Sequence, residues 1–228
     1  MPTRTTKSPN GRTKSAAIAP TKPQKRARKA RPETSVCVYC GSGIGSNPAY
    51  PAAAREVGTA LARAGIGLVY GGGSLGLMGE VARATLAAGG YVTGIIPEFL
   101  TAREHMLTDV SELLITTDMH ERKRLMFERS SAFVALPGGI GTLEELVEQL
   151  TWSQLGRHQK PIVVANVAEF WSPFLSLLAH MKADQFIRTG LDVRFTVVND
   201  ARHVVPAIAA QLGASGATTP DAAVLAKF

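Results

Sequence analysis

A run of charged residues, Asp118–Arg124, carries the side chains that an anionic ligand would need. Its sequence is Asp-Met-His-Glu-Arg-Lys-Arg, and Arg122 and Lys123 are suited to contacts with a phosphate group or an electron-rich base. A charged run on a helix is usually a solvated face, and a single histidine such as His120 is more often structural than catalytic. This run, however, opens a predicted helix directly after a predicted strand, which is where α/β folds bind ligands.

A second segment, Pro137–Glu145, combines a glycine-rich loop with a carboxylate. Its sequence is Pro-Gly-Gly-Ile-Gly-Thr-Leu-Glu-Glu. Thr142 and Glu145 have the spacing of a capping box, with Thr142 as the N-cap, and that alone would explain both residues. A capping box does not explain the glycines before it, so the alternative is that Glu145 reaches a sugar hydroxyl or a water beside a phosphate cradle. The residues alone leave both interpretations open.

Three predicted strand-to-helix loops, at residues 40–46, 70–79 and 136–145, are rich in glycine. Glycine lets the backbone approach a ligand closely, and a helix that begins after such a loop favours an anion. We therefore expect a phosphate-bearing ligand, with Ser42, Gly72 and Gly73 as phosphate-loop candidates. The first loop reads Gly-Ser-Gly-Ile-Gly and not G-x-G-x-x-G, and no G-x-x-x-x-G-K-[ST] is present, which disfavours a nicotinamide-dependent enzyme and a P-loop ATPase.

Short apolar runs alternate with helical ones along the chain, which is typical of a parallel sheet covered on both faces. The predicted strands are Ser35–Cys40, Gly67–Tyr70, Tyr91–Ile96, Glu112–Thr116, Ala132–Leu136, Ile162–Ala165 and Phe195–Val198. The predicted helices are Pro51–Ala64, Leu77–Ala88, Asp118–Ser130, Thr142–Leu155, Phe174–Gln185 and Ala201–Leu212. We expect a single α/β domain with a Rossmann-like, doubly wound parallel sheet that binds its ligand at the carboxyl ends of the strands.

Two of these helices carry further signals. Asp118 and Glu121 have the spacing of a capping box at the start of their helix. Leu143, Leu146, Val147 and Leu150 form an i, i+3, i+4, i+7 stripe that should face the sheet.

Composition divides the chain into three segments. Residues 1–33 hold ten Lys or Arg, one acidic residue and almost no large apolar side chain, so we expect a disordered basic tail. Residues 34–212 are the predicted nucleotide-binding catalytic domain, and residues 213–228 a loose C-terminal tail. The chain beyond residue 33 has fifteen basic and seventeen acidic residues, which argues against specific nucleic-acid binding by the folded part.

The two cysteines, Cys37 and Cys40, form a C-x-x-C pattern within a predicted strand. Residues three apart on a strand point to opposite faces, and no second cysteine pair is present to complete a zinc site. We expect buried thiols in a reducing compartment and no metal. No apolar run has the length of a membrane span and no secretory signal is visible, so we expect a cytoplasmic protein that does not bind membranes.

Taken together, these segments resemble the LOG (lonely guy) family, whose members are cytokinin riboside 5′-monophosphate phosphoribohydrolases. The family patterns are P-G-G-x-G-T-x-x-E at Pro137–Glu145, M-H-x-R-K at Met119–Lys123 and G-G-G-x-x-G-L-M-G at Gly71–Gly79. Thr151–Trp152 and Gln154–Gly156 are similar to the end of the family's following helix. The resemblance extends from about Ser35 to Val198.

The resemblance implies a homodimer that uses neither a metal nor an organic cofactor, with Arg122 and Glu145 as the catalytic pair. The substrate contacts that it implies are Glu104, Lys123, Gly139, Ile140, Gly141, Thr142, Leu143, Glu144 and Thr151. The first loop departs from the family, because Gly43 stands where many members have serine. The family's Pro-Arg-Glu is Ala102–Glu104 here, which keeps the charged pair.

The expected activity is hydrolysis of the N-glycosidic bond of cytokinin riboside 5′-monophosphates, of AMP, or of both, to free base and ribose 5-phosphate. Glu145 would orient or deprotonate the attacking water, and Arg122 would stabilise the departing base. Gly139, Gly141 and Thr142 would hold the 5′-phosphate, and Met106, Met119 or Met126 would line the base pocket.

Two alternatives stay open: a purine-nucleotide sensor without catalysis, and a carrier of a phosphorylated pterin cofactor. The lysine decarboxylase label used for the family has no support, because no lysine lies in a strand-to-helix loop suited to a Schiff base.

Overall fold

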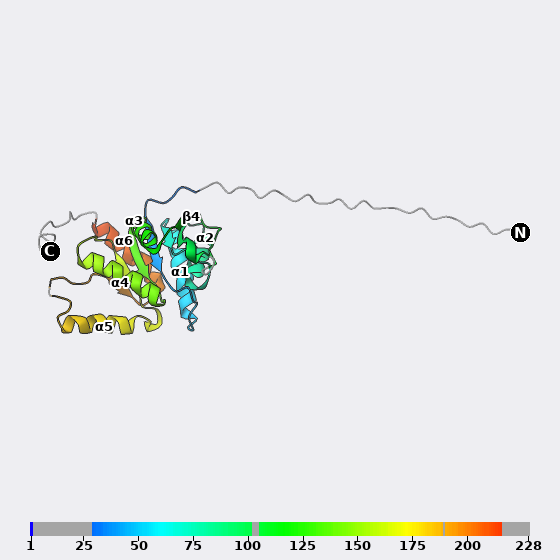
Figure 1. The fold of residues 1–228 in the computed structure, drawn as a ribbon. Coiled ribbons are helices and arrows are strands. Elements are labelled where there is room, and N and C mark those ends of the chain that lie inside the picture. The colour runs from blue at the N-terminus through cyan, green and yellow to red at the C-terminus, as the bar shows by residue number, and fades with distance from the viewer. Residues whose placement is uncertain (2–28, 102–104, 189, 216–228) are drawn as a thin grey trace.

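The computed structural model describes residues 1, 29–101, 105–188 and 190–215. Its centre is a seven-stranded, all-parallel sheet with the strand order β4-β3-β2-β1-β5-β6-β7 (Figure 1). The strands are β1 Ser35–Tyr39, β2 Gly67–Tyr70, β3 Val92–Pro97, β4 Glu112–Thr116, β5 Ala132–Ala135, β6 Ile162–Ala165 and β7 Thr196–Val198. The predicted parallel α/β fold and all seven predicted strands are confirmed.

The helices alternate with the strands as predicted, and their ends differ from the prediction by three residues at most. They are α1 Ala49–Arg63, α2 Gly76–Ala87, α3 Met119–Glu128, α4 Ile140–Gln154, α5 Ser172–Ala183 and α6 Val204–Ser215. Short 3-10 turns lie at Glu98–Leu100, Val167–Glu169 and Ala201–His203, and the last of these leads into α6.

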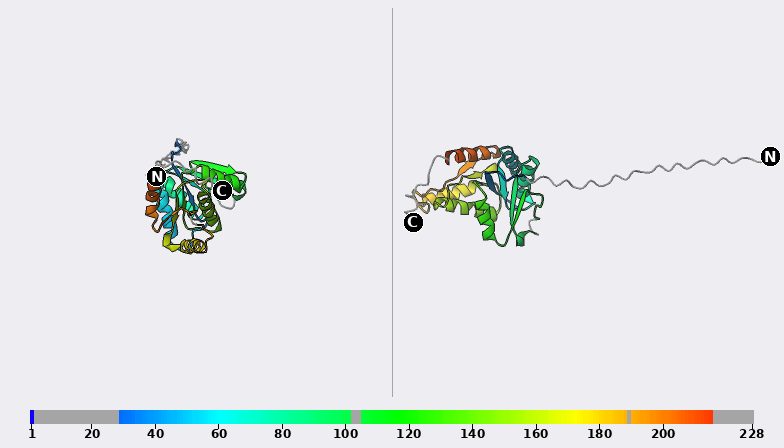
Figure 2. Two further views of the ribbon diagram at one scale, coloured as in Figure 1. Left: turned by 90° about the vertical axis from the view of Figure 1, so that its left-hand side faces the viewer. Right: turned by 90° about the horizontal axis from the view of Figure 1, so that it is seen from above.

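Helices cover both faces of the sheet because its central strands are apolar on both sides. Val36 and Val38 on β1 pack with α1, α2 and α6, whereas Cys37 and Tyr39 pack with α3, α4 and the start of α5. Figure 2 shows this layering from above, with α6 (orange-red) on one side of the sheet and α5 (yellow) on the other. Cys37 and Cys40 are buried, unbonded thiols in the two opposite layers, as predicted.

The buried face of α4 differs from the predicted stripe. Leu146 and Leu150 are buried and Leu143 is partly buried, but the side chain of Val147 is 42% exposed. The prediction that Val147 faces the sheet is wrong. The face of α4 that is turned inward instead includes the polar residues Thr142, Glu145 and Gln149.

The two predicted tails lie largely outside the described residues, and their disorder stays a prediction. The folded part continues to Ser215, three residues past the predicted end of the domain. Among the described helices, none is long and apolar enough to cross a membrane.

Candidate functional site

The strand order reverses between β1 and β5, and the loops that follow these two strands meet at this point. The N–H of Gly41 donates to the carbonyl of Pro137 at 3.0 Å. The N–H of Leu77, at the start of α2, donates to the carbonyl of Gly41 at 3.0 Å. All three glycine-rich loops therefore converge at the switch point of the sheet, which is the usual ligand site of such folds.

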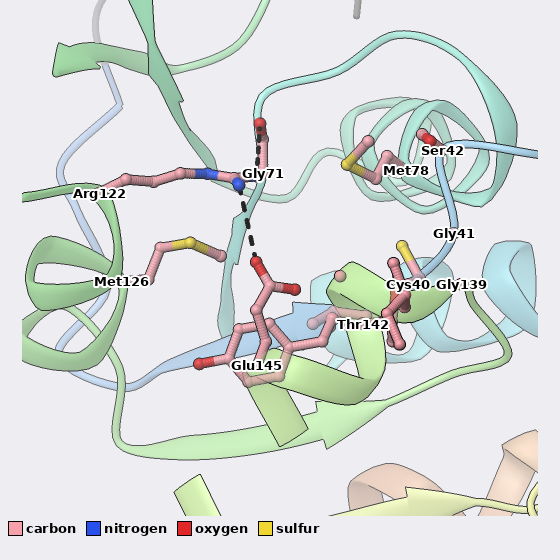
Figure 3. Close-up of a pocket in the computed structure, with 14 residues that line it drawn as sticks. Cys40, Gly41, Ser42, Gly71, Met78, Arg122, Met126, Gly139, Thr142 and Glu145 are labelled. Carbon is pink, nitrogen blue, oxygen red and sulfur yellow. Dashed lines mark hydrogen bonds and ion pairs between the residues drawn. The ribbon is translucent and has the colours of Figure 1, made fainter. Parts of the chain in front are cut away.

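A cavity of about 330 Å³ opens at this junction (Figure 3). Its walls come from the ends of β1 and β2, from α2 and α3, and from the first turns of α4. The lining residues are Val38, Tyr39, Cys40, Gly41, Ser42, Gly71, Met78, Arg122, Met126, Gly139, Ile140, Gly141, Thr142 and Glu145. The structure thus brings together the predicted catalytic pair, the predicted phosphate-holding residues and Ser42.

One wall of the cavity is the N-terminus of α4, and it lacks a side-chain cap. The N-cap is Gly139, which has an extended backbone and no side chain to accept the first N–H groups. The interpretation of Thr142 and Glu145 as a plain capping box is therefore wrong, because Thr142 is already the third residue of the helix. Uncapped N–H groups beside a cavity, at the positive end of a helix dipole, favour an anionic ligand.

The opposite wall contains Arg122, which lies on α3. The start of α3 is capped by Asp118, whose carboxylate accepts the N–H of Glu121 at 2.8 Å. The carboxylate of Glu121 in turn accepts the N–H of Thr117 at 2.8 Å. In the predicted capping box Glu121 would accept the N–H of Asp118, so the observed donor lies one residue earlier. These contacts fix the first turn of the helix that carries Arg122.

Arg122 and Glu145 form a buried ion pair, with 3.7 Å between Nη1 and Oε1 (Figure 3). Burial raises the pKa of Glu145 to about 7, and the neighbouring Arg122 guanidinium opposes this rise only in part. A carboxyl group with such a pKa can give or take a proton near neutral pH, as a general acid or base must.

Methionine side chains add apolar surface around this pair. Met126 lines the cavity as expected, and so does Met78, which the sequence did not single out. Neither Met119 nor Met106 is among the residues that line the cavity. The Sδ of Met119 lies 4.0 Å from Nη1 of Arg122, and Met106 pairs with Gly73 in an isolated bridge.

Tyr39 and Cys40 were also missed by the sequence argument. Both line the cavity: Tyr39 is the last residue of β1, and Cys40 is the first residue of the glycine-rich loop that follows. Burial raises the pKa of both side chains, so the phenol and the thiol stay neutral.

Several predicted contacts lie outside the cavity of this chain. The ammonium of Lys123 pairs with Glu144 at 2.7 Å and with Glu148 at 2.8 Å. Burial lowers the pKa of Lys123, but the two carboxylates outweigh it and the net shift is upward. Leu143 packs into the core, and the hydroxyl of Thr151 donates to the carbonyl of Val147 at 2.8 Å. The helical period places these residues on other faces of α3 and α4 than Arg122 and Glu145.

Gly72 and Gly73 also do not line the cavity. Both are buried, and both contact the segment that follows residues 102–104. The carbonyl of Gly72 accepts the N–H of Leu107 at 3.0 Å, and Gly73 forms the bridge to Met106. Glu104 lies outside the described residues.

The chain matches a family profile and is similar in sequence to several known proteins. The profile of the family described as "Possible lysine decarboxylase" matches residues 78–208. The chain is 45% identical over 185 residues to the cytokinin riboside 5′-monophosphate phosphoribohydrolase of Rhodococcoides fascians, a match that covers 79% of this chain and 92% of that protein. It is 47% identical over 152 residues to cytokinin riboside 5′-monophosphate phosphoribohydrolase LOG1 of Arabidopsis thaliana, covering 67% and 71%.

Among solved structures, the chain resembles the Moco carrier protein of Chlamydomonas reinhardtii. The TM-score is 0.60 at 22% identity, and the alignment covers 81% of this chain and 99% of that one. The molybdenum cofactor binding protein of Rippkaea orientalis aligns with a TM-score of 0.59 at 19% identity, covering 80% and 98%. At this level of identity the likeness concerns the fold alone.

Proposed function

Because this chain belongs to the family of cytokinin riboside 5′-monophosphate phosphoribohydrolases, we propose that it hydrolyses the N-glycosidic bond of such nucleotides. The products are the free base and ribose 5-phosphate. The observation that carries the proposal is the buried Arg122–Glu145 pair, with 3.7 Å between its nearest charged atoms, which lines one cavity together with the uncapped N-terminus of α4. A protein that only binds nucleotides has no need of such a pair.

The reaction follows from the charges that develop as the bond breaks. The C1′–N bond cleaves with its electron pair moving to the base, and a water oxygen bonds to C1′. Glu145, with its pKa near 7, accepts a proton from that water. Arg122 stabilises the negative charge on the departing base. The proton that Glu145 takes from the water is finally transferred to the base.

The 5′-phosphate belongs at the start of α4, where Gly139, Gly141 and Thr142 line the cavity together with Ser42. A Cβ on Gly139 or Gly141 would meet no protein atom within 4 Å, so the backbone is open to a ligand at both positions. Binding energy from the phosphate, remote from the bond that breaks, holds the sugar against Glu145.

Lysine decarboxylation does not fit this site. Pyridoxal phosphate chemistry requires a Schiff-base lysine, and no lysine is among the described residues that line the cavity.

We also propose that the enzyme is a cytoplasmic homodimer that pairs along α4. Ile140, Val147 and Leu155 are exposed apolar residues, and they recur at spacings that place them on one side of α4. Glu144 and Thr151, substrate contacts implied by the family that lie outside this chain's cavity, share that side. A second copy packed here would place these residues near a site.

The first test is incubation of the purified protein with AMP and with isopentenyladenosine 5′-monophosphate, with the matching nucleosides as controls. Chromatography would follow free base and ribose 5-phosphate. Release from the monophosphates only is the expected result, and the ratio of the two rates identifies the preferred base. Binding of AMP without release would favour a nucleotide sensor, and stable co-purification of a coloured cofactor would favour a pterin carrier.

A further inference from the structure

The guanidinium of Arg122 is held in place by two backbone carbonyls. Its Nε donates to the carbonyl of Ile95 in β3 at 3.2 Å, and its Nη2 donates to the carbonyl of Gly71, directly after β2, at 3.3 Å. Figure 3 shows the side chain extending from α3 toward Gly71, with the remaining nitrogen facing Glu145. These two hydrogen bonds, to β3 and to the residue after β2, therefore orient the third nitrogen, Nη1.

A side chain at residue 71 would displace Arg122 or Met78 from its present position. A Cβ built on Gly71 would overlap Nη2 of Arg122 and would lie 2.9 Å from Sδ of Met78, closer than real Cβ atoms come. Unlike Gly72, Gly71 is outside the left-handed region of φ, so its backbone does not require glycine. What a Cβ at residue 71 would change is therefore the position of the Arg122 guanidinium.

We propose that Gly71 is a positioning residue for the hydrolysis: its missing side chain lets Arg122 lie against the ends of β2 and β3 and present Nη1 to Glu145 and the departing base. The inference rests on the proposed function. Gly71 also lines the cavity, but the role proposed for it is exerted through the position of Arg122.

The position of Arg122 also affects how Glu145 titrates. Besides Arg122, the groups that act on Glu145 are Lys123 from α3, Glu144 and Glu148 from α4, Cys37 and Tyr39 from β1, and Cys40 directly after β1. Arg122 is the strongest of these that favours the carboxylate. Pushing its guanidinium away should therefore raise the pKa of Glu145 further.

The test is Gly71→Ala, with Gly58→Ala as a matched control. Gly58 is also a buried glycine. A Cβ there would overlap the carbonyl of Val81 where α1 packs on α2, on the face of the sheet opposite to α3. We expect kcat for AMP or isopentenyladenosine 5′-monophosphate to fall about 100-fold in Gly71→Ala with little change in KM, as for a misplaced catalytic group. In Gly58→Ala we expect a lower melting temperature and an unchanged kcat for the folded enzyme.

Two further measurements separate positioning from a general structural defect. The pKa of Glu145, followed by carboxyl ¹³C NMR, should rise in Gly71→Ala and stay constant in Gly58→Ala. In an Arg122→Lys background, which lacks Nη2, Gly71→Ala should cost little more activity, because both changes remove the same interaction. A full additional loss in that background would overturn the proposal.

The NMR titration does not depend on turnover. If the wild-type protein released no base from either nucleotide, the proposed function would fail, and the titration would still decide whether Gly71 positions Arg122. An unchanged pKa of Glu145 in Gly71→Ala, or equal kcat losses in Gly71→Ala and Gly58→Ala, would show that Gly71 has no positioning role.

Discussion

At the scale of single residues, the site depends on two charges that the fold withdraws from water. Arg122 and Glu145 are both buried, and each would be costly alone, since an isolated charge in the interior loses its hydration. Arg122 recovers part of this cost from two carbonyl acceptors, whereas Glu145 has Arg122 as its one ion-pair partner among the described residues. Burial raises the pKa of the Glu145 carboxyl group to about 7, which places its titration close to neutral pH.

Replacing Glu145 by Gln should abolish most of the turnover and leave the fold intact, because the amide keeps the shape but cannot take a proton from water. In the wild type, the activity should fall as the pH drops below about 7, where Glu145 becomes protonated. Steady-state kinetics against pH would measure both effects, with the exposed Glu128→Gln as control. Full activity of Glu145→Gln would leave Glu145 with no part in catalysis.

The same titration affects stability. The folded-state pKa of Glu145 is raised above its unfolded value, so its contribution to stability is fully present below the unfolded pKa and is lost as the pH rises through about 7. Melting temperatures between about pH 5 and about pH 8 should fall less in Glu145→Gln than in the wild type.

At the scale of elements, α4 performs two tasks with one amphipathic pattern. Leu146 and Leu150 anchor it to the sheet, while Thr142 and Glu145, on the same inward side, line the cavity. The stripe in the sequence correctly indicates a helix that packs on the sheet, but it assigns Val147 to the wrong face. The apolar stripe does not indicate that Glu145 occupies part of the inward face of α4, because the burial of Glu145 depends on its ion pair with Arg122 from α3.

Leu146→Ala should lower the free energy of unfolding by about 3 kcal/mol, the usual cost of emptying such a core position. Leu146 is 1% exposed, whereas Leu177, on α5, is 47% exposed and is the matched control for the same substitution. Chemical denaturation of the two variants would measure the difference. Equal losses would contradict the packing assigned to α4.

At the scale of the whole molecule, the ligand site lies where the strand order reverses, and the outer side of α4 is left exposed. Ile140, Val147 and Leu155 are apolar and exposed on this side. Proteins seldom leave such a surface uncovered without a reason. A homodimer in which α4 of one copy packs on the other would cover it.

Val147→Asp should shift the protein from dimer to monomer in sedimentation velocity, because the new carboxylate would be buried without a partner. Val197→Asp on the edge strand β7 is the control, since Val197 is 40% exposed and Val147 42%. A wild-type protein that sediments as a monomer would disprove the proposed dimer.

Much of this protein is determined by its sequence alone. The alternation of apolar strands and helices follows from burial on both faces of a parallel sheet, so the strands and α-helices of the described residues were predictable. The motifs around Arg122 and Glu145 indicated the family, because their residue types and spacing are local features, and they predicted that these two residues would lie in one site.

Only the tertiary structure decided how distant segments meet. It placed Met78, Tyr39 and Cys40 in the cavity, and it turned Lys123 toward Glu144 and Glu148 instead. It also showed that the Arg122 guanidinium occupies the space that a Cβ on Gly71 would need. These are contacts between elements far apart in the chain, and they depend on how strands and helices pack, which no local pattern of residues encodes.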